Sequence, residues 1–487
     1  MAQRPNLLFL MPDQLRADFL GCYGADFVST PNIDRIAAQG VRYNRAYSTS
    51  PICVPARASL LTGYSAIRTG VTDNGLWLRP DHASCGMPTW PELLSANGYY
   101  TAAVGKMHFY PWDDRLGFQY RVIAEDKRWL HIRDDYYHFL RDHGHRKLHG
   151  NEHEGYYGNR GAIVNRLPWE LSVDHFVGQE ACRFLRTYGR EAPFALMVGF
   201  PGPHCPYDPN EEFLQQIDPD AMPAAIPEAF GAAPLLRQRN IDGNRRPWNG
   251  VDYTEFTAEH KRKIRTHYAA LVHQIDHEVG AILATLDEMG LAENTVVLFA
   301  SDHGDYLGDH NLIGKGSFFE TSIHVPLIVH EPDMSGAATC DDLVELLDIT
   351  ATLLHCAGCA APAPLDSIPL PGVASPHERR RKFLVGATSD GWMVYDGVWK
   401  LAKYSTGEQL LFNLADDPTE QRNLIHHPAH RKRYHQLDTL LTTEVMRSLT
   451  QSHADKRLYT TDSLSGDAEF GKEGWQRMYP APLGESG

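Results

Sequence analysis

Cys53 and Arg57 place a nucleophile and a permanent positive charge within five residues. Pro55 lies between them, and Gly63 follows after a run of helix-compatible residues. Proline is tolerated in the first turn of a helix, where its missing N–H would be unpaired anyway, and glycine commonly ends a helix. The pattern predicts a short helix that begins at Cys53, where free N–H groups and the helix dipole favour an anion. By its position, Cys53 is either a thiolate nucleophile activated by the helix or a buried structural cysteine.

Four polar clusters each follow a short apolar segment. The apolar segments have the continuous hydrophobic pattern of buried parallel strands and span residues 6–11, 101–105, 194–200 and 294–300. The polar residues that follow them are Asp13 and Gln14, Lys106 and His108, His204, and Asp302 and His303. In an open α/β sheet, ligands bind at the carboxyl ends of the strands. We therefore expect the four clusters to meet at one edge of a sheet, beside Cys53.

Asp13, Asp302 and His303 together form a candidate site for one divalent cation. Two carboxylates and an imidazole are metal ligands, and they leave room for a substrate oxygen and for a group derived from Cys53. Considered singly, Asp13 is also explained as a turn or cap carboxylate, and the polar run that starts at Ser301 as a strand-ending turn. The expected convergence of these residues favours the metal site.

The remaining pattern predicts an α/β protein with two parts. Helical spacing is clearest over residues 257–289, whereas residues 209–251 are expected to form a loop. Later in the chain, short alternating segments with Asp396 and Gly397 as a turn predict a small antiparallel sheet, followed by a helix from residue 427 and an aperiodic tail. The expected division is a catalytic domain over 1–375, with an insertion over the site at about 112–166, and a C-terminal subdomain over 376–487.

The composition excludes several classes of partner. There are 46 Lys and Arg residues against 61 Asp and Glu residues, and the resulting net charge of −15 argues against nucleic acid or an anionic membrane as the main partner. No segment approaches the length of a transmembrane helix, and the apolar run after residue 6 is too short for a signal sequence. Eight cysteines without a tight framework spacing indicate reduced thiols. We expect a cytoplasmic protein that acts on a small-molecule substrate. The sequence is also compatible with a homo-oligomer.

These segments resemble the type I sulfatases, a family of the alkaline phosphatase superfamily. The run from Cys53 to Gly63 reads C-x-P-x-R-A-S-L-L-T-G, and further blocks occur in the family's order. Those blocks are Asp13, Gly105-Lys106-x-His108, Gly202-Pro203-His204, Ser301-Asp302-His303-Gly304, Gly314-Lys315-Gly316 and the late segment from Leu411 to Leu424. The resemblance implies an alkaline phosphatase-like fold, with a large mixed, mostly parallel sheet flanked by helices. It also implies that a formylglycine-generating enzyme oxidises Cys53 to formylglycine, whose hydrated aldehyde is the nucleophile.

The resemblance also implies roles for the residues around the bound anion. Arg57, Lys106 and Lys315 would hold the sulfate oxygens and the aldehyde hydrate. His108 would hydrogen-bond the formylglycine hydroxyl, and His204 would face the leaving group. The implied reaction is the hydrolysis of a sulfate ester to an alcohol and inorganic sulfate.

By the same resemblance, the metal would be bound by Asp13, Asp302, His303 and the formylglycine at position 53, and the amide oxygen of Gln14 is a further candidate ligand. Many family members have a second aspartate where this chain has Gln14, and many have asparagine where it has His303. Calcium is the usual metal of the family and is our first expectation. An imidazole ligand is more typical of manganese or zinc, so Mn²⁺, Zn²⁺ and Mg²⁺ are alternatives.

Two other functions stay open. Gln14 and His303 also resemble the pattern of the phosphonate monoester hydrolases, relatives in the same superfamily, which makes a phosphonate monoester or a phosphodiester an alternative substrate. Lys106 and His108, by contrast, are sulfatase-like at a position where we expect those relatives to differ. A non-catalytic anion-binding protein with an unoxidised Cys53 is the third possibility. It is less favoured, because pure binding would not require an acid, a base and metal ligands together.

Overall fold

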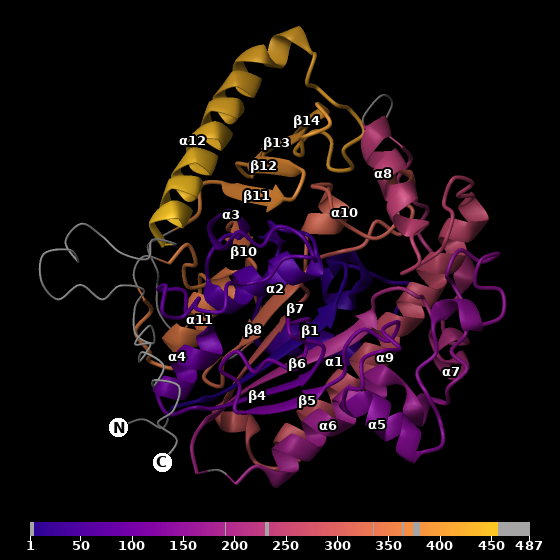
Figure 1. Cartoon of the computed structure of the whole chain (residues 1–487), viewed down its shortest axis with the longest axis vertical. Helices are drawn as coiled ribbons and strands as arrows, with labels where there is room; N and C mark the ends of the chain where they lie inside the picture. Colours follow the sequence, from indigo (N-terminus) through magenta and orange to yellow (C-terminus); the bar gives the residue numbers. More distant parts are fainter. Residues whose placement is uncertain are drawn as a thin grey trace, which may run out of the picture.

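An eight-stranded sheet forms the centre of the molecule in the computed structural model (Figure 1), which describes residues 4–455 apart from residues 190, 229–232, 335, 363–364 and 374–379. The strand order is β5-β4-β6-β1-β7-β8-β2-β9. The strands are β1 (Asn6–Asp13), β2 (Val41–Tyr43), β4 (Tyr100–Gly105), β5 (Tyr120–Ile123), β6 (Phe194–Pro203), β7 (Thr295–Ala300), β8 (Leu327–His330) and β9 (Ala338–Cys340). The pairs around β1, β4 and β6 are parallel, whereas β8 pairs antiparallel with β7 and β2. The expected large mixed, mostly parallel sheet is therefore confirmed.

Helices cover both faces of this sheet, because successive residues of each central strand point to opposite faces. In β1, Leu8 and Leu10 enter one core, while Leu7 and Phe9 enter the other. The first core is closed by α1 (Pro31–Gln39), α6 (Val173–Thr187) and α9 (Ala258–Glu288), and the second by α2 (Cys53–Thr62), α4 (Trp90–Ala96) and α11 (Asp348–Cys356). Figure 1 shows the two groups of helices on either side of the strands. The result is a three-layer α/β/α arrangement.

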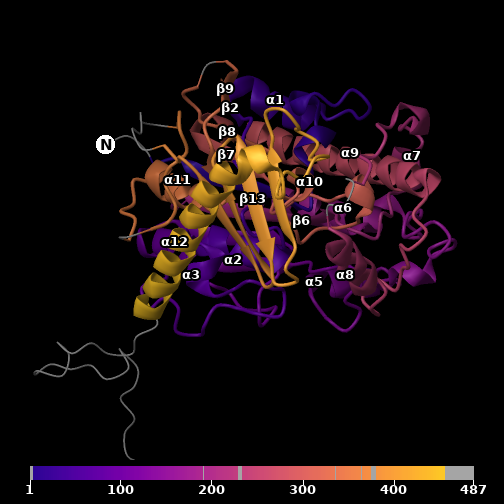
Figure 2. The same ribbon diagram turned by 90° about the horizontal axis from the view of Figure 1, so that it is seen from above.

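A second, four-stranded sheet follows near the C-terminus. It has the antiparallel order β11-β12-β13-β14 and is packed against a long helix, as Figure 2 shows from above. These elements are β11 (Leu384–Thr388), β12 (Gly391–Tyr395), β13 (Trp399–Tyr404), β14 (Gln409–Asn413) and α12 (Arg431–Asp455). The antiparallel sheet and its helix are as expected. The proposed domain boundary at 375/376 and the aperiodic tail after residue 455 lie outside the described residues.

The shorter elements complete the framework. The two-residue strands β3 and β10 pair with each other, and five shorter helices lie between the main elements of the described chain. Their bounds are β3 (Ala46–Tyr47), β10 (Val344–Glu345), α3 (Ala66–Thr69), α5 (Asp135–Asp142), α7 (Glu211–Leu214), α8 (Pro234–Asn244) and α10 (Glu320–Ile323). No helix in the described part of the chain is long and apolar enough to cross a membrane. The cysteines there form no disulfide bond.

Two segments differ from the structure predicted from the sequence. The expectation that residues 209–251 form a loop is wrong, because α8 occupies Pro234–Asn244 and starts with a proline at its first helical position. Its polar composition gave no amphipathic stripe, and only Leu236, Ile241 and Asn244 are buried. The segment 112–166, expected as an insertion, contributes β5 to the edge of the central sheet, where it pairs with β4.

Candidate active site

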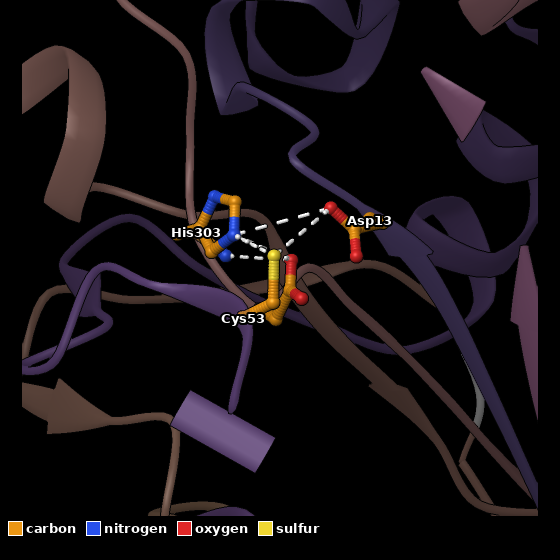
Figure 3. A group of neighbouring side chains, drawn as sticks. Asp13, Cys53 and His303 are labelled. Atoms are coloured by element: carbon orange, nitrogen blue, oxygen red, sulfur yellow. Dashed lines mark hydrogen bonds and ion pairs between the residues drawn. The ribbon is translucent and has the colours of Figure 1, made fainter. Parts of the chain in front are cut away.

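The polar residues that follow the central strands lie together at the carboxyl edge of the sheet. Asp13 ends β1, and Asp302 and His303 follow β7. Cys53 is the first residue of α2, and Figure 3 shows its side chain between those of Asp13 and His303. The Sγ atom of Cys53 lies 3.2 Å from Nε2 of His303 and 3.8 Å from Oδ1 of Asp13. Strand placement alone therefore located this cluster.

Four of these residues form a buried group of possible metal ligands. One ligand atom each from Asp13, Cys53, Asp302 and His303 lies within 4.8 Å of the others. Nδ1 of His303 faces the carbonyl of Gly304 at 3.0 Å, so Nε2 is turned toward the two carboxylates at 3.7 and 3.9 Å. Two carboxylates, an imidazole nitrogen and an atom at position 53 are a donor set that fits one divalent cation.

Arg57 bridges the two carboxylates. Its Nη2 donates to Asp13 and its Nε to Asp302, both at 3.0 Å, and its Nη1 donates to the carbonyl of Lys106 at 2.7 Å. All three side-chain nitrogens are thus engaged, and the side chain is 1% exposed. Burial and the negative charge of Asp13 raise the pKa of Asp302. In this structure the guanidinium contacts the expected metal ligands, and its role as a sulfate-binding group stays a prediction.

Lys106 is a second buried cation at the same edge. Its Nζ lies 2.9 Å from Asp13 and 3.7 Å from Asp126. Burial alone would lower the pKa of Lys106, but the negative charges of Asp13 and Cys53 raise it, so the ammonium is a fixed charge. Asp126 is held in turn by Arg128 at 2.5 Å. Sequence reasoning identified Lys106 but missed Asp126 and Arg128.

The thiol of Cys53 is tuned by the same charges. Burial raises the pKa of Cys53, but the positive charges of Lys315, His303 and Lys106 outweigh burial and hold that pKa well below its usual value. The position therefore stabilises a negative charge on whatever group residue 53 carries, as expected at a helix N-terminus.

Lys315 and His204 lie on the open side of the cluster. The ammonium of Lys315 donates to Nε2 of His204 at 2.6 Å and to Oε1 of Gln14 at 2.5 Å. Nδ1 of His204 donates to the carbonyl of Cys205 at 2.7 Å. Burial, together with the charge of Lys315, lowers the pKa of His204 to about 3. His204 is therefore a neutral imidazole whose Nε2 accepts a hydrogen bond.

His108 occupies a strained position beside these residues. It has a left-handed backbone with φ of 60°, and its buried ring packs edge-to-face on Trp129 at a centroid distance of 4.8 Å. Among the described residues, neither of its ring nitrogens has a hydrogen-bond partner. Two unpaired buried nitrogens are costly, which fits a residue that hydrogen-bonds a substrate or a group at position 53.

Glu125, which sequence reasoning missed, holds the backbone of His108. Its Oε1 accepts the N–H of Met107 at 3.2 Å, and both of its oxygens accept the N–H of His108 at 3.1 Å. Glu125 is fully buried and follows β5, the neighbour of β4. Glu125 thus also follows a strand of the central sheet, one whose pattern is too weak to predict from the sequence.

We predict that Glu125→Gln lowers kcat/KM by about 10- to 10²-fold, because an amide NH₂ group would face the N–H of His108 and displace its ring. The matched control is Glu420→Gln, since Glu420 is also buried and also accepts a backbone N–H, that of Glu320, but lies in the segment after β14, outside the site. Thermal unfolding and kinetics of both variants separate the effects. Equal losses of activity in both would show that Glu125 has only a structural role.

Comparisons with known proteins identify the family of this chain. The family model for sulfatases matches residues 5–359, and the model "N-sulphoglucosamine sulphohydrolase, C-terminal" matches residues 308–447. An arylsulfatase of Clostridium perfringens is 30% identical over 473 residues, which cover 91% of this chain and 94% of the relative. A choline-sulfatase of Rhizobium meliloti is 30% identical over 449 residues, which cover 87% and 83%.

A solved structure shares the fold. The phosphonate monoester hydrolase of Agrobacterium radiobacter superposes with a TM-score of 0.76 at 23% sequence identity, and the match covers 91% of this chain and 96% of that one. At this identity the likeness concerns the fold alone. The family match spans the metal-ligand candidates, Cys53 and Lys315, and the two sulfatases align over most of their length. This chain therefore belongs to the sulfatase family of the alkaline phosphatase superfamily and is a hydrolase of that family.

Proposed function

We propose that the protein hydrolyses a small-molecule sulfate ester to an alcohol and inorganic sulfate, with a formylglycine made from Cys53 as the nucleophile. The observation that carries the proposal is the position of Cys53. It starts α2, lies within 4.8 Å of the Asp13, Asp302 and His303 ligand atoms, and has the pKa of its thiol lowered by surrounding cations. That environment suits an anionic nucleophile that meets an anionic substrate.

A bound metal and the modified residue would supply the chemistry that the twenty amino acids lack. Asp13, Asp302, His303 and residue 53 would hold one divalent cation, with Ca²⁺ as the first candidate and Mn²⁺, Mg²⁺ and Zn²⁺ as alternatives. When present, the metal provides a Lewis acid and the formylglycine hydrate provides two hydroxyls on one carbon.

The other residues of the site would stabilise negative charge and transfer protons. Lys106 and Lys315 face the site as cations and would stabilise the negative charge on the ester oxygens in the transition state. His108 is close enough to Cys53 to help lower the pKa of its thiol, and an unpaired ring nitrogen can take a proton from a hydroxyl there. Because Nε2 of neutral His204 accepts a bond from Lys315, the proton nearest the leaving group is on Lys315.

The leaving group would occupy a cavity of about 220 Å³ next to Lys315 and His204. Trp248, Tyr253 and Ile313 form apolar parts of its wall.

Hydrolysis of a phosphonate monoester or a phosphodiester is the second candidate function. It is favoured by Gln14 and His303, which depart from the usual sulfatase pattern, and by the fold shared with the phosphonate monoester hydrolase of Agrobacterium radiobacter. Such esters are also tetrahedral anions, so the cations at this site would serve them as well.

Mass spectrometry of the peptide that contains Cys53 tests the nucleophile. We expect an aldehyde or its hydrate in protein co-expressed with a formylglycine-generating enzyme, whereas an unmodified thiol would favour an anion-binding protein. The converted protein is then assayed with a sulfate ester, a phosphonate monoester and a phosphodiester of 4-nitrophenol. We expect kcat/KM for the sulfate to exceed the other two by about tenfold or more, as for a site built for one ester class. The reverse order would establish the second candidate.

A further inference from the structure

Gln14 is held in one orientation by its neighbours. Its amide Nε2 donates to the carboxylate of Asp305, and its Oε1 accepts the ammonium of Lys315 at 2.5 Å. A carboxylate only accepts and an ammonium only donates, so a flipped amide would face both neighbours with the wrong group. The amide oxygen of Gln14, which was expected as a metal ligand, is therefore directed toward Lys315.

The backbone of Gln14 is fixed as firmly. It has a left-handed conformation with φ of 71°, its N–H donates to Oδ1 of Asp302 at 2.9 Å, and its carbonyl accepts the hydroxyl of Tyr268 at 2.6 Å. The residue is fully buried. A non-glycine residue persists in this backbone region only where surrounding contacts determine it, as they do here.

Asp305 connects Gln14 to the loop that carries Lys315. Its Oδ2 accepts from Gln14 and from the hydroxyl of Tyr207 at 2.7 Å. Its Oδ1 accepts the N–H of Leu307 at 3.0 Å and that of Gly314, the residue before Lys315, at 2.9 Å. The buried carboxylate of Asp305 thus orients the amide of Gln14. It also holds the backbone next to Lys315, whose ammonium this amide oxygen accepts.

The two active-site lysines differ in their partners. Lys106 pairs with the carboxylates of Asp13 and Asp126. Lys315 forms no ion pair within the described residues and donates instead to two neutral acceptors, the oxygen of Gln14 and Nε2 of His204. Lys315 is therefore held in place by neutral groups, one of which is the amide of Gln14.

We propose that Gln14 is a positioning residue for Lys315 rather than a metal ligand, and that Asp305 sets its amide so that Lys315 is aimed at the leaving-group oxygen. The proposal rests on the hydrolytic function above. The neutral amide of Gln14 holds this ammonium without neutralising its charge.

The test is Gln14→Met in the full-length, converted enzyme, because methionine keeps the length and removes both hydrogen bonds. Aryl sulfates that range from nitrophenyl to unsubstituted phenyl esters measure the need for an acid, since a poor leaving group departs only with a proton. We expect kcat/KM to fall by about 10²-fold for the phenyl ester and by no more than about threefold for the nitrophenyl ester. Binding of Ca²⁺ and Mn²⁺, followed by calorimetry, should be unchanged, because the removed amide contacts Asp305 and Lys315 rather than a proposed metal ligand.

Two further variants make the test specific. Lys315→Met should show the same leaving-group dependence, and adding Gln14→Met to it should cause little further loss, because residues that act as a unit are not additive. Gln274→Met is the matched control, since Gln274 is also buried and its amide is also hydrogen-bonded, to Asn210, but it lies in α9 outside the site. This control should leave the leaving-group dependence unchanged.

Two results would overturn this proposal, and both differ from the result that would overturn the proposed function. A metal affinity reduced 10-fold or more, with equal losses for every ester and recovery at high metal concentration, would make Gln14 a ligand and overturn the proposal. Parallel leaving-group dependences in wild type and Gln14→Met would overturn it as well. If the wild-type enzyme hydrolysed none of the esters, the proposed function would fail, and unchanged metal binding by Gln14→Met would still exclude a ligand role.

Discussion

Cys53→Ser is expected to give an enzyme that accepts one sulfuryl group and then stops. The serine hydroxyl would occupy the place of the thiol beside His303 and Asp13 and can attack sulfur once. It lacks the second hydroxyl on the same carbon, so the sulfated residue has no internal route to release sulfate. We expect steady-state turnover to fall by at least about 10³-fold, as for loss of a covalent nucleophile. Intact-protein mass spectrometry after substrate addition should show one sulfuryl adduct at position 53.

A cysteine outside the site provides the control for this variant. Cys182 is also buried but lies in α6, so Cys182→Ser should turn over normally and carry no adduct. Multiple turnovers by Cys53→Ser at the wild-type rate would contradict the proposed nucleophile.

Arg57→Ala should cause the largest loss of stability among the site variants. Arg57 bridges the buried carboxylates of Asp13 and Asp302, and its removal leaves Asp302 without its guanidinium partner and Asp13 with Lys106 alone. Removing one partner of a buried ion pair typically costs about 3–5 kcal/mol. Activity should also fall by about 10²- to 10³-fold, because the carboxylates that we propose as metal ligands lose their alignment. Urea unfolding of the metal-free protein measures the first effect, and kcat/KM the second.

Arg381 offers a matched comparison far along the chain. It also bridges two carboxylates, those of Asp348 and Glu345, and its side chain is mostly buried. Arg381→Ala should therefore destabilise the protein while leaving kcat/KM nearly unchanged. An Arg57→Ala protein as stable as wild type would show that Asp13 and Asp302 do not repel each other when the guanidinium is absent.

The sequence predicted those parts of the site that lie on strongly patterned elements. The central strands are buried on both faces, so they read as unbroken apolar runs, and their ends located Asp13, His204 and Asp302 without any knowledge of the family. The long helix α9 was equally clear, because one apolar stripe runs from Ile264 to Leu286.

The other parts of the site lie on elements with a weak hydrophobic pattern or depend on contacts between distant residues. β5 has four residues, of which only Val122 is fully buried, so it gave no apolar run and its followers Glu125 and Asp126 were not linked to the site. The orientation of the Gln14 amide depends on Asp305, 291 residues away in the chain. A local pattern cannot contain a contact of that kind, so the role of Gln14 could only be read from the structure.

The burial of Cys53 has a consequence for how the protein is made. Its side chain is 1% exposed and is enclosed by His303, which is 250 residues later in the chain. The oxidation that we propose therefore has to occur before this part of the chain is in place. At about 5–20 residues per second, the ribosome needs roughly 12–50 s to synthesise those 250 residues. The yield of active enzyme should then depend on whether Cys53 is oxidised before the chain folds. Slower synthesis should raise the fraction of protein with an oxidised Cys53, whereas refolding of unmodified protein should not raise it.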